Sequence, residues 1–221
     1  MNKIFKILLS LPKTLYFNFR FLPFNQAFKL PVWIANDSYI NIKGTVLLDV
    51  DKVCPAMIRL GFHFVPICDR HSTSQIIVSP QGRIVFKGDA HLGKGTKIYV
   101  GKDAELILGN NFAISSCSQI NCFKKIIFGN DIQFSWDCLV MDSDTHQIMG
   151  QQDVVINEDK EIRFENKIWI GCRVIILKGA LIPSNCIIGA GSIVTGTDFK
   201  YGTIILGNPA KSVKKISGWK I

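Results

Sequence analysis

The chain has 221 residues, 48% of them apolar, and a formal charge of +9 from 26 Lys and Arg against 17 Asp and Glu. This size suits one domain, since β domains commonly reach it undivided. The basic residues are scattered among apolar ones without a recognition motif or an aromatic platform, so we exclude a nucleic-acid-binding protein. Anionic ligands explain the charge better.

Residues 1–35 form a basic and aromatic segment. Its first thirty residues hold five Lys or Arg, no Asp or Glu, and six of the 15 Phe. No apolar run is long enough to cross a bilayer, and no small-residue cleavage site follows the run before Pro12, so we expect neither a transmembrane helix nor a signal peptide. Two interpretations stay open: the segment caps the domain as a helix or extended strand, or residues 1–30 contact an anionic membrane surface.

Residues 36–128 have the composition of short strands separated by turns. The clearest strand candidates are 84–86, 98–100 and 126–128, and the stretch 40–80 is expected to start or cap a repeat. Apolar–Gly pairs recur with spacings of eight, eight and twenty residues, at Leu92, Val100, Leu108 and Phe128. We interpret this uneven spacing as early turns of a repeat with longer sides or bulges.

A group of chemically active residues lies between Trp136 and His146. A polar insertion at 147–163 follows and interrupts the apolar repeat, as a loop overhanging a groove would. In an extended segment Asp142, Asp144 and His146 project to one side, and a carboxylate beside an imidazole orients it. We expect His146 and Asp144 to be catalytic and Trp136 and Asp142 to bind the acceptor. The alternative is a solvated histidine with acids that cap turns.

From residue 164 onward, large apolar residues recur at a strict period of six, at Phe164, Ile170, Ile176, Ile182, Ile188 and Val194. Small residues hold a second phase of the same period, at Val174, Ala180, Cys186 and Ser192. A helix repeats every three to four residues and a half-buried strand every two, so a period of six fits neither. The pattern predicts a solenoid in which each flat side contributes one large residue to a shared core.

The seven cysteines include no CxxC pair and are odd in number, which argues against a disulfide framework. Cys138 and Cys186 are expected to face inward as small apolar residues. We expect a reducing, cytoplasmic location, at the inner face of the membrane if residues 1–30 contact it. His63, His71 and His91 lie outside any motif, so we predict no metal site.

The run from Ile168 to Ile216 resembles the C-terminal half of the hexapeptide-repeat acyltransferases. Within that superfamily it is similar to the sugar O-acetyltransferases and the acetyltransferases of surface-polysaccharide clusters. The resemblance is strong over 126–216 and plausible over 80–125. It implies an all-β solenoid, a left-handed parallel β-helix over residues 36–206, that assembles as a homotrimer.

The resemblance also implies an activity, the acetyl-CoA-dependent O-acetylation of a sugar or glycan acceptor. Members carry a catalytic histidine just before the chain leaves a coil, and His146 matches that position. His146 would accept the proton of a hydroxyl that attacks the thioester directly, while a backbone N–H stabilises the tetrahedral intermediate. This route requires neither an acyl-enzyme nor a metal.

In that superfamily the pantetheine of coenzyme A lies along the coil edges between two subunits, where small residues allow close approach. Relatives often carry Lys or Arg after the threonine, a place that Gly196 occupies here. The matching positions for coenzyme binding are Gly171, Cys172, Ala190, Gly191, Thr195 and Gly196.

Residues 207–221 are expected to form a short helix and tail. Asn208 is a good N-cap and Pro209 suits the first helical position. On such a helix Lys211 and Lys214 share a face. The resemblance implies that these two lysines meet the nucleotide end of coenzyme A.

Three other functions compete with this interpretation. A carbonic-anhydrase-like β-helix needs three histidines converging on one metal, and the wide scatter of the four histidines argues against it. A sugar N-acyltransferase acting on a nucleotide-linked aminosugar shares the fold and the coenzyme. A non-catalytic solenoid scaffold is the alternative that is not an enzyme.

Overall fold

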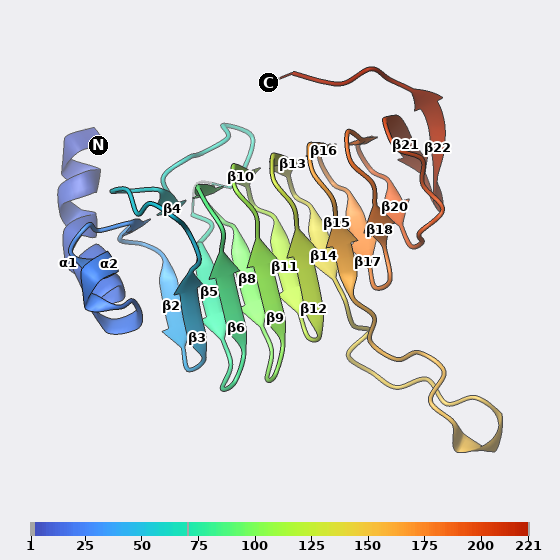
Figure 1. Cartoon of the computed structure of the whole chain (residues 1–221), viewed down its shortest axis with the longest axis horizontal. Coiled ribbons are helices and arrows are strands. Elements are labelled where there is room, and N and C mark those ends of the chain that lie inside the picture. The colour runs from blue at the N-terminus through green and yellow to red at the C-terminus, as the bar shows by residue number, and fades with distance from the viewer. Residues whose placement is uncertain (1–2, 70, 221) are drawn as a thin grey trace.

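The computed structural model describes residues 3–69 and 71–220, which form a solenoid covered by helices at its N-terminal end (Figure 1). Helix α1 (Lys3–Phe21) and the short α2 (Phe24–Ala27) precede the strands. Most strands pair in parallel with the strand three places further along the chain, so that each coil contributes one strand to each of three sheets. The fold is the solenoid that the six-residue period predicts, and it is the left-handed parallel β-helix that the family resemblance implies.

The three sheets form the three sides of the solenoid. The first sheet contains β1 (Val32–Ile34), β4 (Ile58–Leu60), β7 (Ala90–Leu92), β10 (Phe112–Ser116), β13 (Ile132–Trp136), β16 (Ile168–Ile170), β19 (Ile187–Ile188), β21 (Thr203–Gly207) and β22 (Ala210–Lys215). The second contains β2 (Tyr39–Ile42), β5 (Gln75–Val78), β8 (Lys97–Val100), β11 (Gln119–Cys122), β14 (Leu139–Met141), β17 (Ile175–Leu177) and β20 (Ile193–Val194). The third contains β3 (Thr45–Leu48), β6 (Arg83–Phe86), β9 (Glu105–Leu108), β12 (Lys125–Phe128), β15 (Ile162–Phe164) and β18 (Leu181–Ile182).

The core lies along the axis of the solenoid. Every residue of the six-residue period and of its small-residue phase, Cys186 included, is at most 1% exposed, which confirms that both phases point inward. Cys138 is buried in the same way. In the middle coils the core contains stacked aromatic rings, with 4.5 Å between the ring centroids of Phe128 and Phe164. The strands predicted in the first half of the chain are confirmed by β6, β8 and β12, and residues 40–80 start the solenoid.

The corners explain several of the small residues. We call the turn from the first to the second sheet the first corner, and the turn from the second to the third sheet the second corner. At the first corner Gly171 lies so close to the next coil that a Cβ atom there would be 2.7 Å from the backbone nitrogen of Ala190. The glycine therefore allows successive coils to stack at this point.

Helix α1 packs against strand β1 across the N-terminal end of the solenoid (Figure 1). The cap predicted for residues 1–35 is thus helical, and the first solenoid strand, β1, lies just before the boundary predicted at residue 36. Among the described residues, no helix combines the length and the apolar character needed to span a bilayer.

The helix predicted at the C-terminus is wrong. Residues 210–215 form strand β22, which pairs antiparallel with β21, and Asn208 and Pro209 form the turn of this hairpin. The Asn-Pro pair that suits a helix start suits a turn equally well. Pairing with β22 satisfies the backbone groups on the edge of β21, which a helix would leave without strand partners.

Candidate functional site

The chain leaves the solenoid at the second corner between β14 and β15 and forms a projecting arm, residues 142–161 (Figure 1). The insertion predicted at 147–163 is confirmed as an interruption of the solenoid, but it begins at residue 142 and ends at residue 161, just before β15. It forms a hairpin and is not an irregular loop. Met149 and Val155 form an antiparallel bridge, and the turn at Gln151–Asp153 closes the tip. The arm is therefore a defined element on which His146 is exposed.

Asp142 anchors the base of the arm inside the protein. Its side chain is fully buried, and its carboxylate accepts backbone N–H bonds from Phe123 at 2.6 Å, Lys124 at 2.9 Å and Lys125 at 2.7 Å. Burial raises the pKa of this carboxyl, while the three N–H donors oppose the shift. The prediction that Asp142 binds the acceptor is wrong, because no acceptor reaches a fully buried side chain.

Asp144 holds the arm against the neighbouring coil. Its carboxylate accepts hydrogen bonds from Lys178 Nζ at 2.6 Å and from Asn157 Nδ2 at 2.8 Å, and these contacts lower its pKa. Asn157 Nδ2 also donates to the carbonyl of His146 at 2.8 Å, and Lys178 Nζ donates to the Asn157 carbonyl at 2.5 Å. Among the described residues, no hydrogen bond joins Asp144 to the imidazole of His146. Asp144 therefore positions the backbone of the arm.

The expected alignment of Asp142, Asp144 and His146 on one side fails because Thr145 has a positive φ of 61°. The segment turns there and is not extended. Sequence analysis also missed Asn157 and Lys178, which fix the arm. No local motif marks either residue, since Lys178 is 34 positions from Asp144 and meets it only through the stacking of coils.

The residues predicted to bind coenzyme A lie mainly at the first corner. Gly171 and Cys172 follow β16, and Ala190 and Gly191 follow β19 one coil further on. The Gly191 N–H donates to the Cys172 carbonyl at 2.9 Å, which ties the two turns together. Half-buried Trp136 ends β13 at this same corner.

Thr195 and Gly196 follow β20 and lie at the second corner. The arm leaves the solenoid at the same corner, two coils earlier, after β14. The structure therefore separates the predicted residues into two groups. Thr195, Gly196 and the arm with His146 share one corner, and the remaining glycine and alanine positions share another.

Lys211 and Lys214 lie on one face of the C-terminal hairpin, as predicted, although the element is a strand. Lys211 pairs with Leu206 and Lys214 pairs with Ile204, while the register shifts between them. Leu206 and Ile204 are two residues apart on β21 and share a face, so their partners do too. The irregular register thus gives the spacing that a helix was expected to provide.

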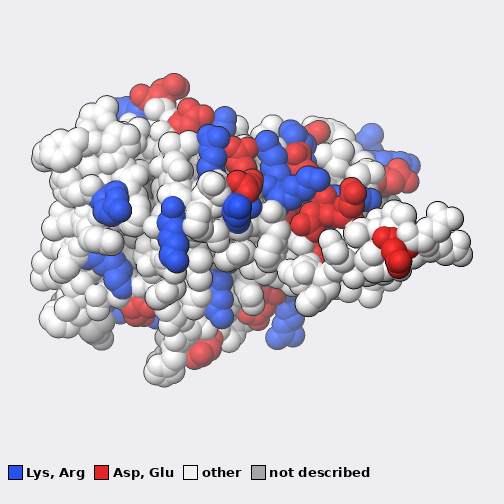
Figure 2. Space-filling model, turned by 90° about the horizontal axis from the view of Figure 1, so that it is seen from below, with Lys and Arg blue, Asp and Glu red and all other residues white. Residues whose placement is uncertain are grey.

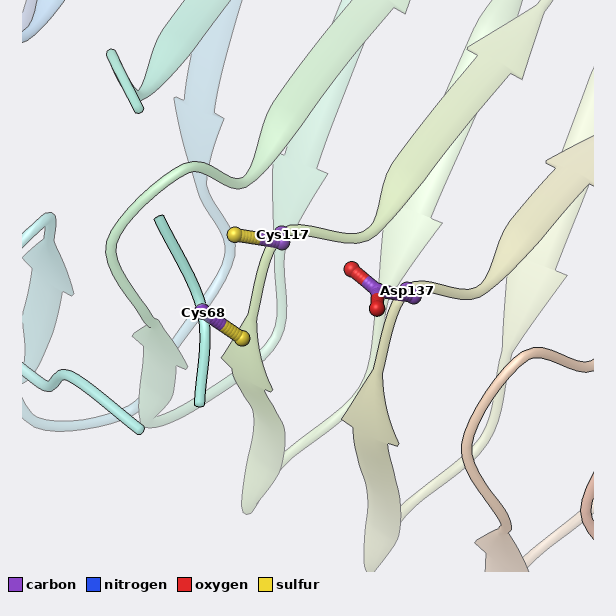
Figure 3. A group of neighbouring side chains, drawn as sticks. All are labelled: Cys68, Cys117 and Asp137. Atoms are coloured by element: carbon purple, nitrogen blue, oxygen red, sulfur yellow. The ribbon is translucent and has the colours of Figure 1, made fainter. Parts of the chain in front are cut away.

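A second group of chemically active residues lies at the first corner, which is covered by the described residues between β4 and β5, 61–69 and 71–74. One ligand atom each from Cys68, Cys117 and Asp137 lies within 4.8 Å of the other two (Figure 3). Cys117 and Asp137 occupy equivalent turns of successive coils, and Cys68 reaches them from the covering segment. Sequence analysis predicted no metal site, because these residues are far apart in the chain and match no motif.

No protein-family model matches the sequence. The chain is 31% identical over 135 residues to the polysialic acid O-acetyltransferase of Escherichia coli O1:K1, covering 61% of this chain and 41% of that protein. It is 32% identical over 95 residues to the galactoside O-acetyltransferase of Lactococcus lactis, covering 42% of this chain and 44% of that protein. The chain thus spans less than half the length of either relative.

The crystal structure of a polysialic-acid-specific acetyltransferase has the same fold, with a TM-score of 0.54 and 23% identity over 86% of this chain and 79% of that one. The resemblance to the hexapeptide-repeat acyltransferases is confirmed. The solved structure shows the fold, and the two O-acetyltransferase relatives show what the matched parts of the chain resemble.

Proposed function

We propose that the protein transfers an acetyl group from acetyl-CoA to a sugar hydroxyl during assembly of a surface polysaccharide. The observation that carries this proposal is His146, exposed on an arm that leaves the solenoid, in a chain similar to two O-acetyltransferases. Imidazole titrates near neutral pH, so it can accept a hydroxyl proton without strong tuning by its surroundings.

In the proposed reaction His146 removes the proton of the acceptor hydroxyl as the oxygen attacks the thioester carbonyl. The C–S bond then breaks, and the thiol of coenzyme A leaves with the proton. Asn157 and Lys178 take no part in the proton transfer. They hold the backbone of the arm that carries the imidazole in place. A backbone N–H at a neighbouring turn would stabilise the oxyanion.

One copy of the chain does not bring all these groups together. The arm with His146 lies at the second corner, whereas Gly171, Cys172, Ala190 and Gly191 lie at the first. A side of about four extended residues separates two corners by roughly 13 Å. A neighbouring copy whose first corner meets the arm would complete the site.

The apolar residues of the arm support assembly with further copies. Ile148, Met149, Val154 and Ile156 are each about half or more exposed, which is unusual for residues of this type on a short hairpin. We therefore propose a homotrimer whose subunits cover these residues. Light scattering should give three times the mass of the chain, and Ile156→Asp should reduce it.

The test is acetyl transfer from acetyl-CoA to polysialic acid and to galactosides, the acceptors named for the relatives, measured by release of free thiol and by product mass. His146→Ala should lower turnover about 100- to 10,000-fold, the range expected for loss of a general base. His91→Ala is the control, because His91 is also exposed, on strand β7, and lies in no proposed site.

Unchanged turnover in His146→Ala, with transfer still dependent on acetyl-CoA, would contradict the assigned base. Transfer to the amine of a nucleotide-linked aminosugar and to none of the hydroxyl acceptors would replace O-acetylation by N-acylation. Absence of transfer together with absence of coenzyme binding would favour the scaffold.

A further inference from the structure

Helix α1 presents its polar side to the protein. Ser10, Thr14 and Asn18 lie on its inner face and are at most 2% exposed. Asn18 Nδ2 donates to the Val32 carbonyl at 2.7 Å, Asn18 Oδ1 accepts the Val32 N–H at 3.1 Å, and Thr14 Oγ1 accepts the Ile34 N–H at 3.1 Å. These side chains satisfy the open edge of β1, which no further strand covers.

The outer side of α1 is a continuous apolar stripe. Its residues recur with the three- and four-residue spacing of one helix face, and all are exposed, namely Phe5, Leu8, Leu9, Pro12, Leu15, Tyr16 and Phe19. Phe24 and Phe28 extend the stripe over α2, 67% and 65% exposed, with 5.4 Å between the ring centroids of Phe19 and Phe28. Among the described residues of α1, Phe17 is the only buried apolar one, 2% exposed, whereas the continuous apolar stripe is turned outward.

The helices that carry this stripe hold only basic charges, and one acid, Asp37, lines a pocket beside Lys6 and Leu9. Lys6, Arg20 and Lys29 are exposed beside it, and the first acidic residue of the chain is Asp37. Figure 2 shows the end of the molecule with α1 and α2 as a largely uncharged surface. Two such surfaces from two copies would bring like charges together, whereas an anionic lipid surface complements both the basic and the apolar residues.

We propose that α1 and α2 form a membrane-binding surface, defined by the seven stripe residues with Phe24 and Phe28, that inserts into the interface of an anionic bilayer. The helix lies across the end of the solenoid, so the solenoid then projects away from the lipid (Figure 1). Strand β14, which leads into the arm, is four strands from β2 in the second sheet, about 19 Å at 4.8 Å per strand.

That distance bears on the acceptor, and this step rests on the proposed function. His146 would stand at least about 19 Å from the lipid surface, since it lies beyond β14 and since α1 lies between the first coil and the lipid. A sugar joined immediately to a lipid phosphate is out of reach at that height. The acceptor class is therefore a sugar further out on a lipid-linked glycan chain.

The test is co-sedimentation of the full chain with vesicles of phosphatidylglycerol and phosphatidylethanolamine, and with neutral phosphatidylcholine vesicles. Binding should be strong on the first, weak on the second, and weakened by salt. The variant Leu8→Ser/Leu15→Ser/Phe24→Ser should bind about tenfold less. Tyr201→Ser is the matched control, because Tyr201 is 66% exposed at the opposite end of the solenoid.

Equal binding by the triple variant and the parent would overturn the proposal, as would absence of binding to anionic vesicles. A change in the mass of the assembly in the triple variant, without a change in vesicle binding, would identify a second copy as the occupant instead. Vesicle binding needs no acceptor, so this result is independent of the acetyl-transfer assay.

The group Cys68, Cys117 and Asp137 carries a second and independent inference. Two sulfurs and one carboxylate are ligands that Zn²⁺ accepts, and their atoms already lie within 4.8 Å of one another. A tetrahedral zinc site with Zn–S bonds of about 2.3 Å places its ligand atoms roughly 3.8 Å apart, so small side-chain rotations suffice. We propose a zinc site with these three ligands and a water molecule, which fastens the described residues between β4 and β5 to the first corner.

The zinc content of the purified protein, measured by mass spectrometry after dialysis against a weak chelator, tests this site. About one zinc per chain is expected for the parent and for Cys54→Ser, a half-buried cysteine outside the group. Cys68→Ser and Asp137→Asn should lose it, and Asp137 is exposed, so its variant should still fold. Zinc-free parent protein, or a disulfide between Cys68 and Cys117 in its place, would overturn the proposal.

Discussion

At the N-terminal end of the solenoid, α1 turns hydroxyl and amide groups toward β1 and apolar residues outward, whereas at the C-terminal end the β21–β22 hairpin turns Ile205 and Ala210 inward and lysines outward. These two elements close the opposite ends of the first sheet. The inner side of α1 uses polar side chains and that of the hairpin uses backbone pairing, and the residues left on the outer side differ as a result.

The N-terminal end has an uncovered strand edge, so it is closed by side chains that hydrogen-bond to the backbone of β1. The polar residues of α1 then lie on its inner face, together with Phe17, and most of its apolar residues remain outside. The C-terminal end adds a strand, whose backbone already satisfies β21, and apolar residues can stay inside. Its exposed edge carries lysines, which also hinder pairing with another copy. Each end thus presents a different surface to a partner.

The largest expected effect concerns the apolar inner side of the hairpin. Ile205→Ala should lower the free energy of unfolding by about 2–5 kcal/mol, because Ile205 is fully buried and its loss leaves a cavity. Urea denaturation measures this value. Ile204→Ala, a half-buried neighbour on the opposite face, is the control and should cost clearly less. Equal costs would mean that the hairpin does not close the core.

At the other end, Asn18→Ala should cost about 2–4 kcal/mol, because it leaves the buried N–H and carbonyl of Val32 without partners. Asn25→Ala, on the exposed side of α2, should leave the stability unchanged. If removal of Asn18 is harmless, α1 is attached by its apolar contacts, and the contrast between the two ends disappears.

The smallest effect concerns binding, with the fold preserved. Lys211→Glu/Lys214→Glu should weaken binding of coenzyme A about tenfold at low salt, because two exposed positive charges on one face become negative. Lys214→Glu alone should give part of this loss, whereas Lys215→Glu makes the same charge change on the other face, where Lys215 pairs with Thr203, and should have little effect. Equal losses in both variants would mean that overall charge attracts the coenzyme and that no contact is made by this face.

The repeat in the second half of the chain could be predicted because each side of a coil adds one large inward residue, six positions after the last. Phe164 and the residues that follow it needed no information from elsewhere in the chain. The prediction of a C-terminal helix was wrong because the structure of that segment depends on a distant part of the chain. Residues 210–215 form a strand because β21 offers an edge to pair with, which local preference does not reveal.

The site was predictable in part. His146 was located because it interrupts the repeat, but the role of Asp142 was misjudged because its burial depends on the backbone N–H groups of the preceding coil. Asn157, Lys178 and the Cys68 group were missed since stacking of coils alone brings them together. For α1, composition left packing and membrane contact as alternatives, and the structure gives the helix one face suited to each.

Calorimetric titration of the purified protein with acetyl-CoA, beside free coenzyme A and longer acyl-CoAs, tests the central claim most directly, because it needs no knowledge of the acceptor. The account predicts saturable binding at about one site per chain, weakened in Lys211→Glu/Lys214→Glu and retained in His146→Ala. Absence of binding by every acyl-CoA would contradict an acyltransferase and leave the solenoid as a scaffold.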